Sequence, residues 1–135
     1  MTYEEWFQQQ GKLHANVMKK LTDKSVDEVI EYFRFENMVK NEPDFCPLYK
    51  KNKKCHDMET LNCFSCGCPY FRLNNDDSEI LSYCSINHKN GGQMKAKKGI
   101  HQDCSKCTVP HKVNFVRRNF NKDWNQIMAK VYNAE

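Results

Sequence analysis

All eight cysteines of this chain lie between Cys46 and Cys107, and the flanking segments 1–45 and 108–135 contain none. The chain starts without the basic segment and apolar run of a secretion signal, and no stretch has the ~18 apolar residues of a membrane span. We therefore expect a cytoplasmic protein that does not bind membranes. Cysteines stay reduced in that compartment and are typical of metal binding, whereas a disulfide framework is the alternative if the chain is exported.

The length of 135 residues and the position of the cysteines indicate a single domain organised by metal. The middle segment is polar, so apolar burial alone would not offset the entropy lost on ordering it. A structural zinc ion would add on the order of 10 kcal/mol. We expect a small α+β, cysteine-rich, metal-stabilised domain. Its parts are a helical flank over 1–42, an irregular metal-binding module with short strands over 43–112, and one C-terminal helix over 113–135.

Two helices are expected in the N-terminal flank. The first begins at the capping-box pattern Thr2-x-x-Glu5, and the second begins at Ser25-x-x-Glu28 and ends near Asn41, before a proline. Apolar residues recur at helical spacing in both segments. We expect these apolar faces to pack into the core.

The middle segment is interrupted by prolines and glycines, which is typical of loops and turns. Short strands are expected over 70–73 and 80–83. The polar, lysine-rich segment 87–99 is expected to be a mobile loop. A single last helix, capped near Asn121, is expected to carry an apolar face.

The spacing of the cysteines predicts two metal sites. A Cys-x-x-Cys pair directs two sulfurs at one ion from a tight turn. The pairs Cys63/Cys66 and Cys104/Cys107 would complete one tetrahedral four-sulfur site. The other four cysteines would form the second site: Cys46, Cys55, Cys68 and Cys84. Because Cys66 and Cys68 are only two positions apart, they would bind metal at two adjacent sites.

Two histidines lie close to cysteines in the sequence. His56 follows Cys55, and His111 lies four residues after Cys107. Either imidazole could replace a thiolate at zinc. The alternative, that each lies beside the site or on the surface, is slightly favoured because eight cysteines suffice for two sites. Three further histidines are expected to be surface residues: His14, His88 and His101.

The identity of the metal is open between two classes. Four cysteines can hold a [4Fe–4S] cluster as well as a zinc ion, and Pro69 after Cys68, with aromatic residues nearby, resembles the apolar surroundings of such clusters. The paired Cys-x-x-Cys motifs favour zinc. We therefore expect zinc, with an iron–sulfur cluster as the alternative.

Three motifs in this order resemble the cysteine-rich small domain family, described as metal-binding domains of bacteria and archaea. They are Cys55-His56, Asn62-Cys63-x-x-Cys66-x-Cys68-Pro69-Tyr70 and Asp103-Cys104-x-x-Cys107-x-x-Pro110-His111. The resemblance covers about residues 44–112. It implies a metal site, adds weight to His56 and His111 as site residues, and carries no established reaction. A long lysine-rich insertion after Cys84 departs from the family pattern and weakens the ligand assignment of that cysteine.

These features predict a metal-binding protein with an accessory or structural role. An iron–sulfur protein with a redox or enzymatic role is the first alternative, although no residues make a clear catalytic set, and we lean against an enzyme. A zinc-dependent nucleic-acid-binding module is the second, suggested by the run Lys50, Lys51, Lys53 and Lys54. It is not favoured, because eight thiolates holding two zinc ions would bring the formal charge of +4 to about zero. A protein partner stays open.

Overall fold

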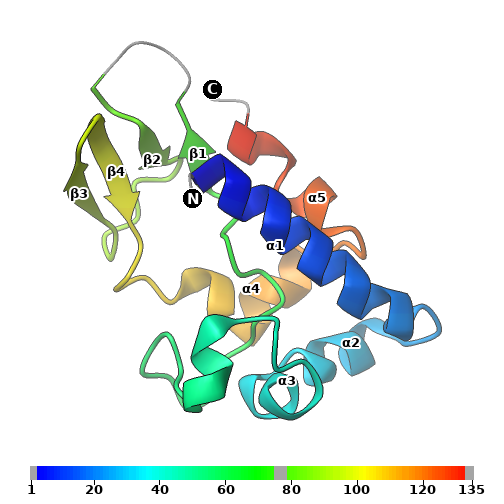
Figure 1. Cartoon of the computed structure of the whole chain (residues 1–135). Coiled ribbons are helices and arrows are strands. Elements are labelled where there is room, and N and C mark those ends of the chain that lie inside the picture. Colours follow the sequence, from blue (N-terminus) through cyan, green and yellow to red (C-terminus); the bar gives the residue numbers. More distant parts are fainter. Residues whose placement is uncertain (1–2, 75–78, 133–135) are drawn as a thin grey trace.

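The computed structural model describes residues 3–74 and 79–132. Within these ranges it contains five α-helices, several short 3-10 turns and two small antiparallel sheets (Figure 1). The prediction of a small α+β fold is therefore confirmed. Among the helices of the described part, none is long and apolar enough to cross a membrane.

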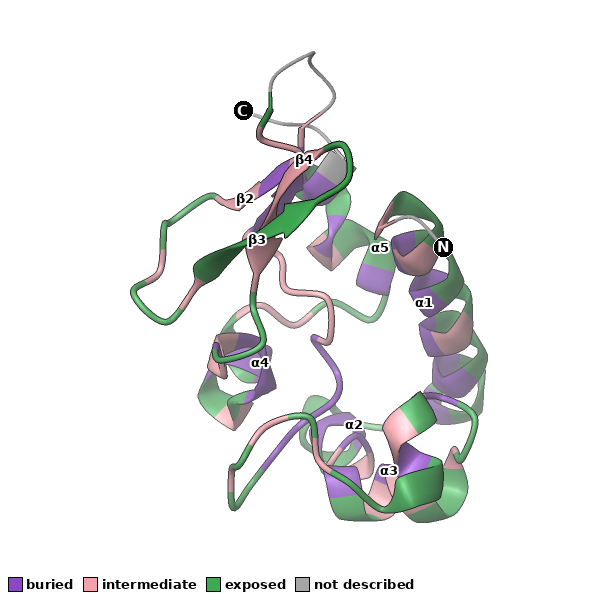
Figure 2. Ribbon diagram, turned by 60° about the vertical axis from the view of Figure 1, so that its left-hand side comes forward, coloured by how far each residue is buried: buried purple, intermediate pink, exposed green. Residues whose placement is uncertain are grey.

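Helix α1, Tyr3–Met18, is the longest element; it crosses the front of the molecule in Figure 1 and runs along one side of it in Figure 2. Its inward face is buried and its outward face is exposed (Figure 2). A 3-10 turn, Lys19–Leu21, continues the helix for three residues. The capping pattern predicted at its start involves Thr2, which lies outside the described residues.

The second predicted helix is two helices. Helix α2, Val26–Tyr32, begins with the predicted capping box between Ser25 and Glu28, and helix α3, Phe35–Asn41, ends at the predicted residue. The chain is extended at Arg34, between them. There the Phe33 carbonyl accepts a hydrogen bond from the Cys63 amide, and the Phe35 amide donates to Leu61. These bonds to the cysteine-rich segment replace helical ones, which helical spacing alone could not predict.

Strands β1, Phe71–Leu73, and β2, Ser82–Cys84, form the first sheet and lie close to the predicted positions. Strands β3, Gly92–Ala96, and β4, Gly99–Asp103, form a second hairpin. The prediction of a loop over 87–99 is therefore wrong for its second half. This segment is polar because every residue of β3 is exposed, and not because it is a loop (Figure 2).

The second hairpin is attached to the first sheet through β4. The Leu81 amide donates to the Ile100 carbonyl at 2.8 Å, and the Ile100 amide donates to Glu79 at 2.8 Å. Gly99 allows this approach: its φ is +154°, and a Cβ atom there would lie 2.2 Å from the Glu79 oxygen. A residue with a side chain would force the hairpin away from the sheet.

The C-terminal part contains two helices and a 3-10 turn, so the prediction of one helix is wrong. Helix α4, Val113–Arg118, follows directly on the last cysteine motif. Helix α5, Trp124–Ile127, is capped by the Asp123 side chain, and a 3-10 turn, Ala129–Tyr132, follows. The predicted apolar face is confirmed at its main positions, since Trp124, Met128 and Val131 are buried.

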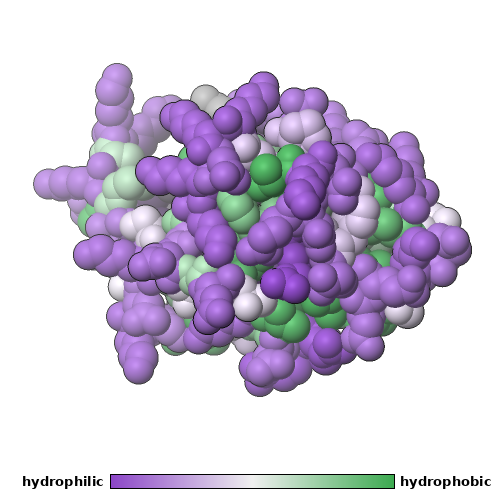
Figure 3. All heavy atoms as spheres, turned by 90° about the horizontal axis from the view of Figure 1, so that it is seen from below, coloured by the Kyte–Doolittle hydropathy of each residue, from purple (hydrophilic) through white to green (hydrophobic). Residues whose placement is uncertain are grey.

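Two apolar clusters hold these elements together. The larger lies between the helices and includes Phe33, Phe64 and Cys63, so a predicted metal ligand is part of the main core. The smaller joins α1, β1 and the C-terminal turn around Phe7 and Trp124. Outside these clusters the surface is mostly hydrophilic on the face shown in Figure 3, with small apolar patches.

Candidate metal centres

All eight cysteines are free thiols and lie in described residues. Their mutual electrostatic influence separates them into two groups of four. Centre 1 consists of Cys46, Cys55, Cys63 and Cys66. Centre 2 consists of Cys68, Cys84, Cys104 and Cys107.

Centre 1 adjoins the main core. Burial and, after it, the neighbouring charges of Cys55 and Cys46 raise the pKa of Cys63 to about 12. Burial also raises the pKa of Cys66, followed in effect by the charges of Cys63, Cys55 and Cys46. Cys63 is buried, Cys46 and Cys66 are half-buried and Cys55 is exposed. Four neighbouring sulfurs that repel one another as thiolates need a compensating cation.

Two buried hydroxyl groups lie beside the cysteines of centre 1. The Tyr49 side chain is 4% exposed, and its hydroxyl acts on the Cys63 sulfur as a hydrogen-bond donor. The Ser65 side chain is 0% exposed and lies in the turn between Cys63 and Cys66, and its hydroxyl oxygen is unpartnered among the described residues. An orphaned buried donor is costly unless it is satisfied. Sulfur atoms of a bound metal group could accept from the two hydroxyl groups.

Centre 2 is built on the two hairpins. All four of its sulfurs line one small cavity of about 30 Å³. Strand pairing aligns Cys84 with Phe71, whose amide donates to the Cys68 carbonyl at 3.1 Å. Cys104 and Cys107 follow β4 in a tight turn closed by a 3.0 Å backbone bond. Centre 2 therefore joins cysteines from the turn before β1, the end of β2 and the turn after β4.

The tripeptide Cys66-Gly67-Cys68 connects the two centres along the chain. Gly67 has φ +115° and Cys68 has φ +58°, both in the left-handed region. A positive φ is unusual for cysteine and costs on the order of 1 kcal/mol. Two consecutive left-handed residues turn the chain sharply, which is how cysteines two positions apart reach different groups.

The grouping differs from the one expected from spacing. The sequence suggested that Cys63 and Cys66 share a site with Cys104 and Cys107, whereas the structure places these pairs in different centres. The spacing argument treated each Cys-x-x-Cys pair as half of one site. In the fold, each pair is instead completed by the cysteines that the nearest turns supply.

The distances between sulfurs bear on the metal. Although all eight cysteines are described, no three of their sulfurs lie within 4.8 Å of one another. A zinc ion with Zn–S bonds of about 2.3 Å holds its four sulfurs about 3.8 Å apart. Zinc binding at either group of four would therefore draw its sulfurs closer together.

One group of ligand atoms in the described part is compact. The Cys55 sulfur and one ring nitrogen each of His56 and His111 all lie within 4.8 Å of one another. The Cys55 Sγ and His111 Nε2 atoms are 3.6 Å apart. We call this group the Cys-His-His group.

The His111 ring is held in place by Asn62. Its Nδ1 atom lies 2.9 Å from the Asn62 carbonyl oxygen, which assigns the proton to Nδ1 and leaves Nε2 with a lone pair. Asn62 is fully buried, and its side chain bonds to the Ile30 carbonyl and the Phe64 amide. Burial lowers the pKa of His111 to about 4, which favours the neutral, metal-binding form.

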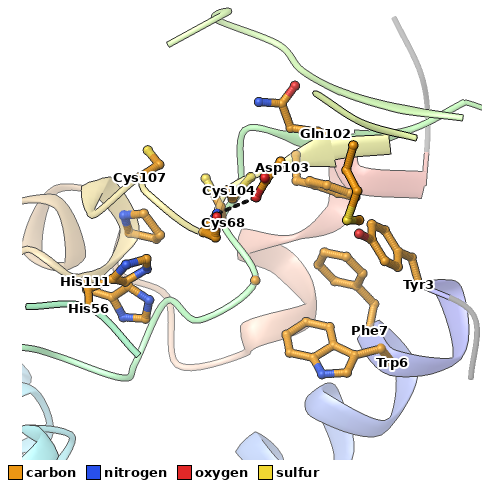
Figure 4. Close-up of a pocket in the computed structure, with 15 residues that line it drawn as sticks. Tyr3, Trp6, Phe7, His56, Cys68, Gln102, Asp103, Cys104, Cys107 and His111 are labelled. Atoms are coloured by element: carbon orange, nitrogen blue, oxygen red, sulfur yellow. Dashed lines mark hydrogen bonds between the residues drawn. The ribbon is translucent and has the colours of Figure 1, made fainter. Parts of the chain in front are cut away.

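A second cavity, which we call the larger cavity because it exceeds the small cavity of centre 2, lies between the Cys-His-His group and centre 2. It has a volume of about 450 Å³ and is lined by both histidines, by Cys68, Cys104 and Cys107, and by residues of α1 and β1. Figure 4 shows the two imidazoles on one side, the rings of Tyr3 and Phe7 on the other, and Cys68 and Cys104 between them. Both expected site histidines therefore face a cavity.

The prediction that the other three histidines lie on the surface is correct only in part. His14 is fully buried, stacked on Phe33, with no partner for either ring nitrogen among the described residues. His88 is half-buried, with Nδ1 3.9 Å from the Cys107 sulfur. His101 is half-buried and bonds to Ser82. The helical spacing of His14 with Leu21 could have indicated its burial.

The lysine run is partly used within the fold. Lys54 donates to the carbonyls of Met58 and Glu59, and its ammonium lies 5.8 Å from the Phe35 ring centroid. Lys50 lies 3.9 Å from an Asp44 oxygen. Lys51 and Lys53 are exposed. Lys54 is therefore engaged within the fold, and nucleic-acid binding by the run stays untested.

Comparisons with protein-family models, with curated proteins and with solved structures gave no match to this chain. The resemblance to the cysteine-rich small domain family therefore stays a prediction carried by the three motifs. The functional argument depends on the geometry of the two centres.

Proposed function

We propose that this chain is a metal-binding protein with two metal centres, each held by four cysteines. Centre 1 would use Cys46, Cys55, Cys63 and Cys66, and centre 2 would use Cys68, Cys84, Cys104 and Cys107. The observation that carries the proposal is the separation of eight free cysteines into two groups of four. Such groups suit soft metals.

The surroundings of centre 1 favour an iron–sulfur cluster, which was the alternative to the zinc that we expected from the sequence. Such clusters are sheltered by apolar side chains. Phe33 and Phe64 are buried in the same core as Cys63 of centre 1. When bound, clusters of this kind supply one-electron redox chemistry.

The chain's own residues would adjust such clusters in different ways. Tyr49 and Ser65 offer hydroxyl donors to centre 1, and hydrogen bonds to sulfur raise the reduction potential of a cluster. Each centre includes one exposed cysteine, Cys55 in centre 1 and Cys104 in centre 2, but three cysteines of centre 2 also line the larger cavity. We infer that centre 2 exchanges electrons with an outside partner more readily than centre 1.

The test is the metal content of protein purified without oxygen. Iron and acid-labile sulfide in about equal amounts, near eight of each per chain, with a brown colour, support two clusters. About two zinc ions per colourless chain would support the cysteine centres and overturn the iron–sulfur assignment. Protein that folds without any bound metal would contradict the proposal as a whole.

A further inference from the structure

We propose that Cys55, His56 and His111 form a separate site for one divalent transition-metal ion, with an open coordination position facing the larger cavity. The proposal depends on the two-centre function only through Cys55, whose sulfur belongs to centre 1. A thiolate sulfur has enough lone pairs to bridge two metals. The Cys-His-His set is of the kind that binds zinc and its substitutes.

The distances fit one ion. With metal–sulfur and metal–nitrogen bonds of about 2.3 and 2.05 Å, tetrahedral coordination places the two ligand atoms about 3.5 Å apart. The Cys55 Sγ and His111 Nε2 atoms lie 3.6 Å apart. The third ligand atom, on His56, is within 4.8 Å of both.

Hydrogen bonds to Asn62 hold the His111 ligand in position. The Nδ1–H group of His111 bonds to the Asn62 carbonyl, which fixes the ring so that Nε2 faces Cys55. The backbones of the same two residues are also joined, because the Asn62 amide donates a hydrogen bond to the His111 carbonyl at 3.0 Å. Such orienting bonds are typical of histidine ligands of metals.

The fourth position would be open to a ligand. Three protein ligands and an open position are typical of metal sites that bind or activate exogenous molecules. The two histidines line the cavity of about 450 Å³, which lies within the ~300–1,000 Å³ range of small-molecule sites. A molecule there would reach the ion from the cavity side.

The opposite wall of the cavity defines the ligand class. The rings of Tyr3 and Phe7 each lie within 5.6 Å of Phe71, centroid to centroid, and form a continuous aromatic surface. Figure 4 shows the Tyr3 and Phe7 rings across the cavity from the imidazoles. A ligand that spans this cavity has an anionic group for the ion and an apolar ring for the wall. We assign it the class of small carboxylates that carry a ring.

The first experiment titrates Co²⁺ into protein purified without oxygen, with its resident metal retained. One Co²⁺ per chain should bind and give ligand-field bands of a tetrahedral site. His56→Ala, and His111→Asn, whose amide keeps a donor for the Asn62 carbonyl, should each weaken binding at least about tenfold. His101→Gln, at a half-buried histidine outside the group, should bind Co²⁺ like the unmodified protein.

The second experiment adds carboxylates to the Co²⁺ protein. Benzoate should shift the ligand-field bands at a concentration several-fold lower than acetate, and Tyr3→Ala should reduce this difference. Absence of Co²⁺ uptake, equal uptake by the histidine variants, or uptake matched by loss of resident metal would overturn the site. If neither benzoate nor acetate shifts the ligand-field bands, the open coordination position is overturned. Failure of the two-centre function would instead appear in the resident metal of the unmodified protein.

Discussion

Centre 1 and centre 2 would bind metal through the same ligand set, four cysteines each, in different surroundings. Cys63 of centre 1 lies in the main core among Phe33, Phe64 and Tyr49. Centre 2 lies on two short hairpins, one strand of which is wholly exposed. A group embedded in the core stabilises the whole protein, whereas one on peripheral hairpins stabilises only a local unit. The same chemistry should therefore contribute differently to folding at the two centres.

The largest difference should appear when one cysteine is removed from each centre. Cys63→Ser should lower the melting temperature by roughly 15 °C, because it removes a ligand that lies in the core and leaves the other three sulfurs of centre 1 without their metal. Cys104→Ser should lower it by less than about 5 °C, since the hairpins can open locally. Calorimetry of both variants measures this, and equal shifts would show that the centres contribute alike.

The core around centre 1 should also make the protein sensitive to acid. Burial lowers the pKa of His14 to about 4, from an ordinary value near 6.5. The neutral ring is favoured in the fold, so its contribution is complete above pH 6.5 and is lost as the pH falls toward 4. The loss should reach about 2 kcal/mol at pH 5. Denaturant unfolding of His14→Leu should lack this part of the pH dependence, and an unchanged slope would exclude His14 as its source.

The hairpin side can be perturbed without touching a sulfur. In Gly99→Ala the new Cβ atom would meet the Glu79 carbonyl, and the φ of +154° is unfavourable for alanine. We expect a loss of roughly 2 kcal/mol in local stability and faster release of metal from centre 2 only. Gly92→Ala is the matched control, because nothing lies within 4 Å of its Cβ position. Metal release from centre 1 in Gly99→Ala would mean that the two regions are coupled.

The smallest predicted effect concerns the contact between the C-terminal part and the turn of centre 1. The Trp124 indole N–H donates to the Cys66 carbonyl at 3.2 Å. Trp124→Phe keeps most of the apolar packing and removes this bond, so it should cost about 1 kcal/mol in unfolding free energy. It should leave the metal content of both centres unchanged. Loss of metal from centre 1 would make this bond part of the site itself.

The local signals of the sequence predicted much of the fold. The capping box at Ser25 and the first two strands follow from short-range patterns, and the structure contains them. The break at Arg34 could not be predicted in this way. It depends on hydrogen bonds to Leu61 and Cys63, which lie far along the chain.

The candidate ligands were predictable, but their grouping was not. Cysteine spacing identifies residues that can bind metal, whereas the left-handed turn at Gly67 and Cys68 separates neighbouring cysteines. In the sequence, Asn62 stands out only as part of a motif. Its role in orienting His111 depends on a contact between residues 49 positions apart.

The grouping of the cysteines is the central claim, and the metal content of two double variants tests it most directly. Cys46→Ser with Cys63→Ser should remove one centre and leave about half the metal, because both residues belong to centre 1. Cys63→Ser with Cys104→Ser should remove both centres. The grouping expected from spacing alone requires the reverse, with both centres lost in the first variant and half the metal kept in the second. That reversed result would contradict the account.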